Sequence, residues 1–246
     1  MKKLLFSALA VCAIALGFSA CSSDDDDEAK QIIVKTTPLE AVDLGLSIKW
    51  ANKNVGANGP EGYGEYFGWG DSTARGDNWA TDYKYNWEYA QFNNHQPRTF
   101  NQTYFKQNMD RFCPNGTLAP EYDAATQING SEWRMPTESE WKELYDSCTW
   151  VWTTVNSIDG YEVTGPNGNK IFLPAAGKRN SGSLVDSGRQ GYYWSSTLDE
   201  IPRMVNHQEV LQLWYAFCLY FRSNGIYASA YPYEHFYGFQ IRPVHK

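Results

Sequence analysis

The stretch GSEWRMPTESEWKELYDSC at residues 130–148 decides the fold, because the start of a helix can be read directly from it. Thr137 and Glu140 form a capping box, whose hydroxyl and carboxylate satisfy two amide donors that the first helical turn leaves unpaired. Apolar residues then recur at helical spacing: Trp141, Leu144, Tyr145 and Cys148. We therefore expect a helix that begins after Thr137 and buries this stripe in a core.

The rest of the chain predicts a second short helix and a series of short strands. Asp123 precedes Ala124 and Ala125 as a candidate helix cap. Strand patterns lie at residues 42–51, 149–155, 161–164, 170–173, 191–197, 213–221, 226–233 and 239–244. Turns are expected at Asp159-Gly160 and at residues 165–168, and a long surface loop at residues 198–212. One or two helices with several antiparallel strands indicate an α+β fold.

Composition favours a single domain and excludes nucleic acid as the partner. The 246 residues hold 21 Lys and Arg against 28 Asp and Glu, a net charge of −7, and the basic residues are scattered. Phosphate binding would require a basic stripe. An aromatic fraction of 16% fits both a binding protein and a rigid core. We assign residues 42–246 to the domain.

The N-terminus predicts a lipid anchor. Residues 1–20 read as a signal peptide, with Lys2 and Lys3 before an apolar run and small residues before Cys21. The sequence FSAC at residues 18–21 resembles a bacterial lipobox, whose cysteine carries the lipid. The mature chain would then be held on a membrane by acyl chains such as palmitate, without a spanning segment. A soluble secreted protein is the alternative.

An acidic tether is expected at residues 21–41, because residues 24–28 read DDDDE. Such a run cannot collapse and extends from the membrane. It also resembles the export signal of Bacteroides-type surface lipoproteins, which implies a lipid-anchored protein exposed on the outer membrane. The alternative is a solvated spacer.

Three cysteines remain after the leader and the lipidated residue are set aside: Cys113, Cys148 and Cys218. In an oxidising envelope one pair can form, and we predict a disulfide between Cys113 and Cys148. The odd count leaves one thiol free. Cys218 lies in a strand pattern and is interpreted as a small core residue.

Rings alternate with polar residues in the segment before residue 100. They are Trp79, Tyr83, Tyr85, Trp87 and Tyr89. On an extended segment these rings would line one face and could form a glycan platform. The alternative is a strand that packs its rings inward.

Six motifs, taken in order, resemble the Fibrobacter succinogenes major paralogous domain family. They are VDLGL with KWA at residues 42–51, YGEYFGWG at 63–70, WRMPT at 133–137, FLPAAG at 172–177, GYYWSS at 191–196 and GFQIRPV at 238–244. The resemblance spans nearly all of the domain. It implies a C-type lectin-like fold, akin to the formylglycine-generating-enzyme branch, in surface lipoproteins whose role is mostly unassigned.

The resemblance also implies where a ligand would bind. Some relatives of this fold are targets of diversity-generating retroelements, which vary exposed positions on the C-terminal strands. The corresponding residues are polar or amphipathic and suit adaptable recognition. We take them as the candidate ligand-binding set: Arg222, Asn224, Tyr227, Ser229, Tyr231, Tyr233 and His235.

Signals for catalysis are weak, and we predict a non-enzymatic protein without cofactor or metal. The four histidines have no helical ligand spacing, and Ser195 lacks the glycine elbow of a hydrolase. Formylglycine-generating relatives use a cysteine pair, for which Cys218 is the one C-terminal candidate. Calcium-dependent sugar binding is weakened because Arg98 follows Gln96-Pro97.

Our leading hypothesis is therefore a cell-surface ligand-binding or adhesion module whose partner is an unknown protein or glycan. A calcium-independent glycan-binding component of a polysaccharide-capture system is the second hypothesis, and a formylglycine-generating-enzyme-like oxidase the third. Arg134 and Arg242 are interpreted as buried ion-pair partners rather than ligand contacts.

Overall fold

The computed structural model describes residues 37–72, 111–180, 183–200, 202–205, 208–211, 215–228 and 232–246, and the backbone alone at 202–205 and 208–211. All of them belong to one compact unit, Gln31–Lys246. In this part of the chain, antiparallel strands predominate and two α-helices are present, α4 (Ala124–Asn129) and α5 (Glu138–Ser147). The predicted combination of helices with antiparallel strands is confirmed at this level. Neither helix is long and apolar enough to cross a membrane.

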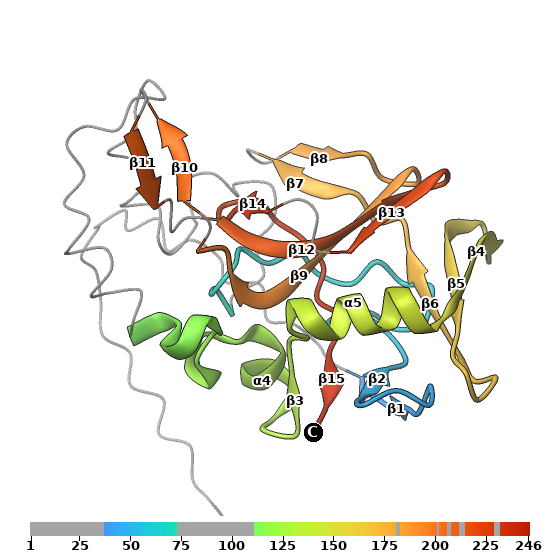
Figure 1. The fold of residues 1–246 in the computed structure, drawn as a ribbon. Coiled ribbons are helices and arrows are strands. Elements are labelled where there is room, and N and C mark those ends of the chain that lie inside the picture. The colour runs from blue at the N-terminus through green and yellow to red at the C-terminus, as the bar shows by residue number, and fades with distance from the viewer. Residues whose placement is uncertain are drawn as a thin grey trace, which may run out of the picture. The chain divides into compact units, whose positions relative to one another are not determined.

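The central sheet is built around β12 (Tyr215–Arg222), which pairs along one side with β9 (Gln190–Leu198). Its other side pairs with β13 (Gly225–Ala228) and β14 (Tyr233–Glu234), which meet opposite ends of β12. Figure 1 shows helix α5 on one side of this sheet and the β7–β8 hairpin on the other. That hairpin consists of β7 (Lys178–Asn180) and β8 (Ser183–Val185).

A second four-stranded sheet joins segments from both ends of the domain. Its order is β1 (Ala41–Val42), β2 (Lys49–Ala51), β15 (Val244–His245) and β3 (Trp133–Arg134). The C-terminal strand therefore lies between the N-terminal hairpin and the strand that leads into α5. The further strands form two separate units: β4 (Thr149–Val155), β5 (Ile158–Thr164) and β6 (Lys170–Pro174), and the hairpin of β10 (Pro202–Val205) and β11 (Gln208–Leu211).

The predicted helix forms with the predicted cap. Glu140 N–H donates to Thr137 Oγ1 at 3.3 Å, and Thr137 N–H donates to Glu140 Oε2 at 2.8 Å. Trp141 and Leu144 are fully buried, but Tyr145 is 43% exposed. At about 100° per residue, Tyr145 falls at the edge of the face centred between Trp141 and Leu144. The expectation that Tyr145 faces the core was therefore wrong, and the buried stripe is narrower.

Alternation along the central strands divides the core in two. Tyr193, Leu219 and Phe221 point to the α5 side and pack with Trp141 and Leu144. On the opposite side, Tyr192, Trp194 and Cys218 form a second cluster with Phe67, Met135, Phe239 and Ile241. Successive strand residues face opposite sides of a sheet, so each of these strands supplies both cores.

Three predicted strands differ from the structure. Residues 226–233 are divided between β13, which ends at Ala228, and β14, which begins at Tyr233. Residues 42–51 form the β1–β2 hairpin instead of one strand, and they bend at Gly45, whose φ is +77°. In the segment 239–244, Phe239 and Gln240 form isolated bridges with Phe67 and Tyr193, and β15 begins only at Val244. In these last two segments, alternating apolar residues mark burial without a continuous ladder.

Two predicted connections were also wrong. The β4–β5 turn is Asn156-Ser157, with φ of +49° and +67°, whereas Asp159 and Gly160 lie inside β5. A Cβ on Gly160 would approach Leu173 O to 2.3 Å, so this glycine permits close contact with β6. The predicted loop at residues 198–212 contains the β10–β11 hairpin.

The predicted Cys113–Cys148 disulfide is wrong in this structure. Both residues are free thiols, as is Cys218. Cys113 lies in the core cluster opposite α5, whereas Cys148 packs against the cluster under α5. The two thiols are therefore on different sides of the central sheet, where a direct bond between them cannot form.

The two arginines have structural roles. Arg134 forms a two-pronged ion pair with Glu140, at 2.8 and 2.5 Å. Arg242 is fully buried, and its hydrogen bonds go to Asn54 Oδ1, Ala51 O and Phe172 O at 2.7–3.0 Å. Its recorded partners are thus amide and carbonyl oxygens from three segments, and the expectation of a carboxylate partner was wrong for Arg242.

Candidate functional site

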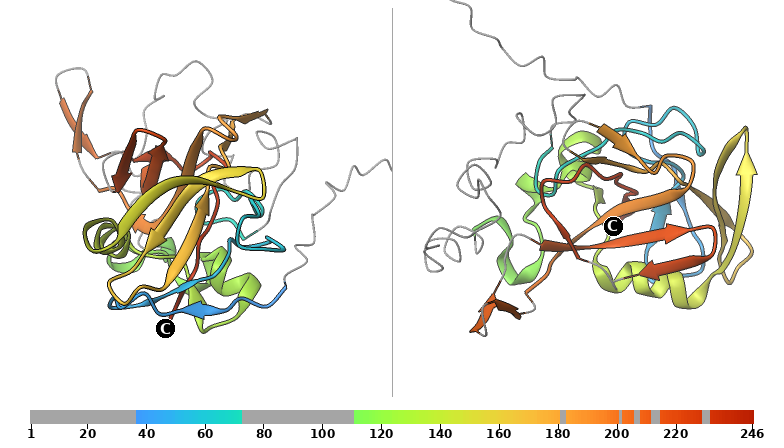
Figure 2. Two further views of the ribbon diagram at one scale, coloured as in Figure 1. Left: turned by 90° about the vertical axis from the view of Figure 1, so that its right-hand side faces the viewer. Right: turned by 90° about the horizontal axis from the view of Figure 1, so that it is seen from above.

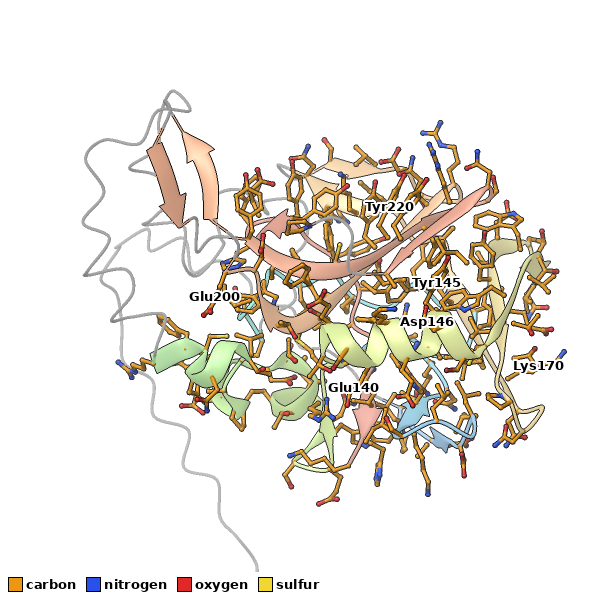
Figure 3. All side chains as sticks on the ribbon, viewed as in Figure 1. Glu140, Tyr145, Asp146, Lys170, Glu200 and Tyr220 are labelled. Carbon is orange, nitrogen blue, oxygen red and sulfur yellow. The ribbon has the colours of Figure 1, made fainter. Side chains whose placement is uncertain are left out.

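Three tyrosines form a row across the central sheet, on the face away from α5. We call Tyr192, Tyr220 and Tyr227 the tyrosine row. Tyr220 on β12 is directly opposite Tyr192 on β9 and Tyr227 on β13, so the three rings lie side by side across the strands. The ring centroids are 5.0 Å apart for Tyr192 and Tyr220, and 5.4 Å apart for Tyr220 and Tyr227. Figure 3 shows Tyr220 on the side of β12 that faces away from α5.

The stacking of the rings determines which of their atoms a ligand can contact. The interplanar angles are 27° and 15°, so each ring covers a face of its neighbour. Tyr192 is 3% exposed and belongs to the core, so the ring edges and hydroxyl groups of the half-buried Tyr220 and Tyr227 are the parts that a ligand would meet, which favours hydrogen bonding over ring stacking. Burial raises the pKa of Tyr192, which keeps this phenol protonated. Its hydroxyl donates to Gln190 Oε1 at 2.6 Å.

A lysine amine lies at one end of the row, inside a cage of tyrosine rings. Lys178 Nζ from β7 is 4.6 Å from the centroid of Tyr192, 4.8 Å from that of Tyr233 and 4.9 Å from that of Tyr237. Tyrosine faces attract a cation at this distance. At the other end, the Arg222 guanidinium lies 6.0 Å from the Tyr227 centroid and can hydrogen-bond to its hydroxyl at 3.4 Å.

Partial burial makes the charged form of Lys178 less favourable than it would be in water. Burial lowers the pKa of Lys178 below its usual value, although Asp186 and Glu234 act in the opposite direction. The side chain is half-buried, so the cage does not fully replace the water that the amine has lost. The site thus pairs a row of tyrosine hydroxyls with a partly desolvated cation and an exposed one.

The structure brings three of the predicted binding residues to this site, whereas His235 is packed elsewhere. Arg222 and Tyr227 lie at one end of the row, and Tyr233 contacts the ring of Tyr192 at the other. Asn224 is exposed in the turn between β12 and β13. Ser229 and Tyr231 lie outside the described residues.

His235 has the contacts of a packed residue. Its ring stacks on Trp69 with centroids 4.2 Å apart, and its carbonyl accepts from Trp69 N–H at 2.9 Å. Nε2 is buried and has no hydrogen-bond partner among the described residues. Burial lowers the pKa of His235 to about 3, so the ring is neutral at physiological pH. These contacts do not support the expectation of a ligand-contacting histidine.

Sequence reasoning missed four members of the site: Lys178, Tyr192, Tyr220 and Tyr237. A usable signal existed for the strand residues, because Gln190, Tyr192 and Trp194 alternate along β9 as Cys218, Tyr220 and Arg222 do along β12. In both strands the polar and ring-bearing end of the alternating face forms the site. Lys178 could not be found in this way, since its neighbours come from other segments.

Three other sequence predictions concern chemistry outside this site. The proposed glycan platform, Trp79, Tyr83, Tyr85, Trp87 and Tyr89, lies outside the described residues, as does Cys21. Cys218 is buried, and burial raises the pKa of its thiol, which disfavours the reactive thiolate. Among the residues that the structure describes, no three His, Cys, Asp or Glu side chains are grouped to hold a metal ion.

Comparison with known proteins assigns no family. No protein-family model, curated protein or solved structure matches this chain. The tyrosine row and its two cations must therefore be interpreted from their own geometry.

Proposed function

We propose that this protein is a non-enzymatic surface lipoprotein that binds a ligand, or adheres to one, through the tyrosine row. The observation that carries the proposal is the register that sets Tyr192, Tyr220 and Tyr227 side by side across three strands. A cation lies at each end of this row, Lys178 at one and Arg222 at the other. Tyrosine hydroxyls between two cations suit a ligand that carries acceptor oxygens.

The position of Lys178 supports a functional interpretation. Burial disfavours the charged form of Lys178, and this cost offsets the cation–π attraction of the three rings, so the amine adds little net stability. A methionine of similar size would serve a purely structural role about as well. We infer that the cation is kept in the tyrosine cage because a ligand uses it.

Membership of the Fibrobacter succinogenes major paralogous domain family, with a C-type lectin-like fold, is part of the proposal. It is supported by the order of the six motifs, and the antiparallel strands with α5 against the central sheet are compatible with it. The motif residues Trp194, Phe239 and Arg242 are fully buried. These motifs would therefore specify mainly the scaffold. The row takes Tyr192 from the motif at 191–196, whereas Tyr220 and Tyr227 lie outside the six motifs.

The cellular location is proposed from the sequence. The lipobox at Cys21 and the acidic run behind it support a lipid anchor on the outer membrane, with the domain facing outward. Metabolic labelling with an alkyne-bearing palmitate analogue tests the anchor. Label should enter the wild-type protein and be absent from Cys21→Ala.

Binding of the purified chain to an array of glycans and extracellular-matrix proteins tests the proposed site. We expect at least one probe to bind, and Arg222→Gln and Tyr220→Ala each to weaken that binding at least tenfold. Lys170→Gln is the matched control, since Lys170 is an exposed cation on β6, away from the row (Figure 3). Binding that Lys170→Gln reduces as much as Arg222→Gln would point to general charge attraction and contradict the proposal.

Calcium-independent glycan binding by a polysaccharide-capture component is the second candidate. It is favoured by the alternating rings of residues 79–89 and, independently, by the hydroxyl-rich surface of the tyrosine row. The same array distinguishes the two platforms. Loss of glycan binding in Trp87→Ala with full binding in Tyr220→Ala would assign the ligand to the earlier segment.

A formylglycine-generating-enzyme-like oxidase is the least supported alternative. It would depend on Cys218, whose burial and raised thiol pKa disfavour the chemistry. Oxidation of a cysteine-containing peptide by the wild-type chain, and its loss in Cys218→Ala, would be required to revive this alternative.

A further inference from the structure

Strand β4 (Thr149–Val155) forms an unusually open sheet edge. It pairs with β5 and with no other strand among the described residues. Figure 1 shows it on the outer side of β5, and Figure 2 shows the yellow β4–β5 hairpin at the margin of the described elements. Its sequence, TWVWTTV, contains no charge and no proline, and its pairing with β5 is continuous over seven residues. Natural edge strands are commonly protected by lysine, proline or a bulge, and β4 has none of these.

The register with β5 decides which backbone groups face outward. The two-residue turn Asn156-Ser157 makes Val155 and Ile158 the closing pair, which exchanges both of its hydrogen bonds. Bonded and non-bonded pairs alternate from there, so residues 149, 151, 153 and 155 bond to β5. The N–H and C=O groups of Trp150, Trp152 and Thr154 point away from β5 and are available to another strand.

The side chains of β4 favour docking as well. Trp150 and Trp152 pack partly buried against the core under α5, which holds the strand in place. On the other face, Val151 is 50% exposed, and Thr149 is exposed beside it. A second strand paired at this edge would lie beside apolar and neutral side chains, so it would desolvate no charge of β4.

We propose that two copies of this chain associate by antiparallel pairing of β4 with β4. A twofold axis at Trp152 uses the outward groups of both copies: Trp152 pairs with Trp152 of the second copy, and Trp150 with Thr154. Val151 then lies opposite Thr153, and Thr149 opposite Val155. This proposal is independent of the ligand site, because β4 and the tyrosine row are on different sheets.

The self-complementarity of β4 supports a second copy as the occupant. A twofold axis at Trp152 matches seven residues with seven and uses the same outward backbone groups of both copies. Strand β4 is neutral, so in this register every residue opposes another neutral residue, and the net charge of −7 places no like charges across the new strand pair.

Cysteine cross-linking of the full chain in detergent tests the register. The double variant Val151→Cys/Thr153→Cys places thiols opposite each other across the axis, where a non-bonded antiparallel pair approaches closely. Under mild oxidation it should form at least tenfold more covalent dimer than Val151→Cys/Thr154→Cys, whose thiols face opposite sides of the sheet. Both variants carry Cys148→Ser, which removes the half-buried native thiol. Equal dimer yields would overturn the register.

Sedimentation from about 1 μM to about 1 mM tests association without cross-links. Val151→Lys should weaken the dimer at least tenfold, whereas Leu184→Lys, a matched change at a 42% exposed residue on β8, should leave it unchanged. Amide exchange gives a residue-level readout, since Trp152 N–H should gain protection with concentration while Thr153 N–H is protected throughout. A chain that stays monomeric, with a freely exchanging Trp152 amide, would overturn the proposal.

Discussion

The two faces of the central sheet are formed by the same strands but differ in how deeply their side chains are buried. On the α5 side, Tyr193, Leu219 and Phe221 are fully buried under a helix. On the other side, the adjacent residues Tyr192 and Tyr220 extend the second core toward the surface as a row of stacked rings. One residue step along β9 or β12 therefore separates a packing role from the face to which we assign the proposed recognition role.

This difference separates stability from binding. A side chain under α5 is surrounded by protein atoms, so its truncation leaves a cavity. Tyr220 and Tyr227 are half-buried, so replacing either by phenylalanine removes a hydroxyl without opening the core. Substitutions on the two faces should therefore give opposite patterns, as the following four predictions specify from the largest effect to the smallest.

Phe221→Ala should lower the free energy of unfolding by about 3–5 kcal/mol. The ring is fully buried and contacts Tyr161 at 5.2 Å and Tyr193 at 5.9 Å between centroids. Urea unfolding monitored by tryptophan fluorescence measures the loss. A loss below about 1 kcal/mol would mean that Phe221 is not closely packed under α5, and it would contradict the difference between the two faces.

Glu140→Gln should cost about 2 kcal/mol at neutral pH, because it weakens the cap and the ion pair that fix α5 against the sheet. Burial alone would raise the pKa of Glu140, but hydrogen bonds from Arg134 and Thr137 outweigh it and hold the pKa below its usual value.

The pH dependence follows from this depressed pKa. The unfolded chain binds the proton more readily, so the stabilisation by Glu140 is present above about pH 4.5 and is lost as the pH falls through the folded-state pKa. Urea titrations at neutral and acid pH should show the wild type and Glu140→Gln converging in acid. A constant difference would contradict the role assigned to this carboxylate.

Lys178→Met should change stability by less than about 1 kcal/mol at neutral pH, since the lost cation–π attraction is offset by relief of the buried charge. The lowered pKa means that the wild type gains stability relative to the variant as the pH rises toward 10.5. Ligand binding should nevertheless fall at least tenfold. A large loss of stability with unchanged binding would make Lys178 a structural residue.

Tyr220→Phe should alter the free energy of unfolding by less than about 0.5 kcal/mol, because the ring and its two stacking partners remain. Removal of the hydroxyl should still weaken binding to any probe that the array identifies. Tyr145→Phe, an equally small change on the exposed side of α5, is the matched control. If both variants bind as the wild type does, the hydroxyls of the row are not part of the site.

Local signals predicted the elements that depend on local chemistry. The caps at Thr137 and Asp123, strand β4 and the turn at residues 165–168 were all foreseen, because each follows from neighbouring residues. The class of fold could be inferred from their order.

Features that depend on distant partners were missed. The bend at Gly45 and the bridges of Phe239 reflect contacts with segments far away in the chain. Only one of the three residues of the tyrosine row was predicted, since Tyr227 was identified without its partners on β9 and β12. Its completion requires the register of three strands, which no single stretch of sequence contains.

The position of β15 between β2 and β3 has a consequence for the order of events during synthesis. Ala51 N–H bonds to Pro243 O at 2.8 Å, and Val55 N–H bonds to Ile241 O at 3.0 Å. The N-terminal segment therefore pairs with residues that lie some 190 positions later in the chain and are synthesised last. Loop closure of that length is slow, and it leaves the domain incomplete until its last strand is available. Until residues 241–245 have been made, β2 and β3 lack the strand that lies between them, so this sheet is the part of the domain that synthesis completes last.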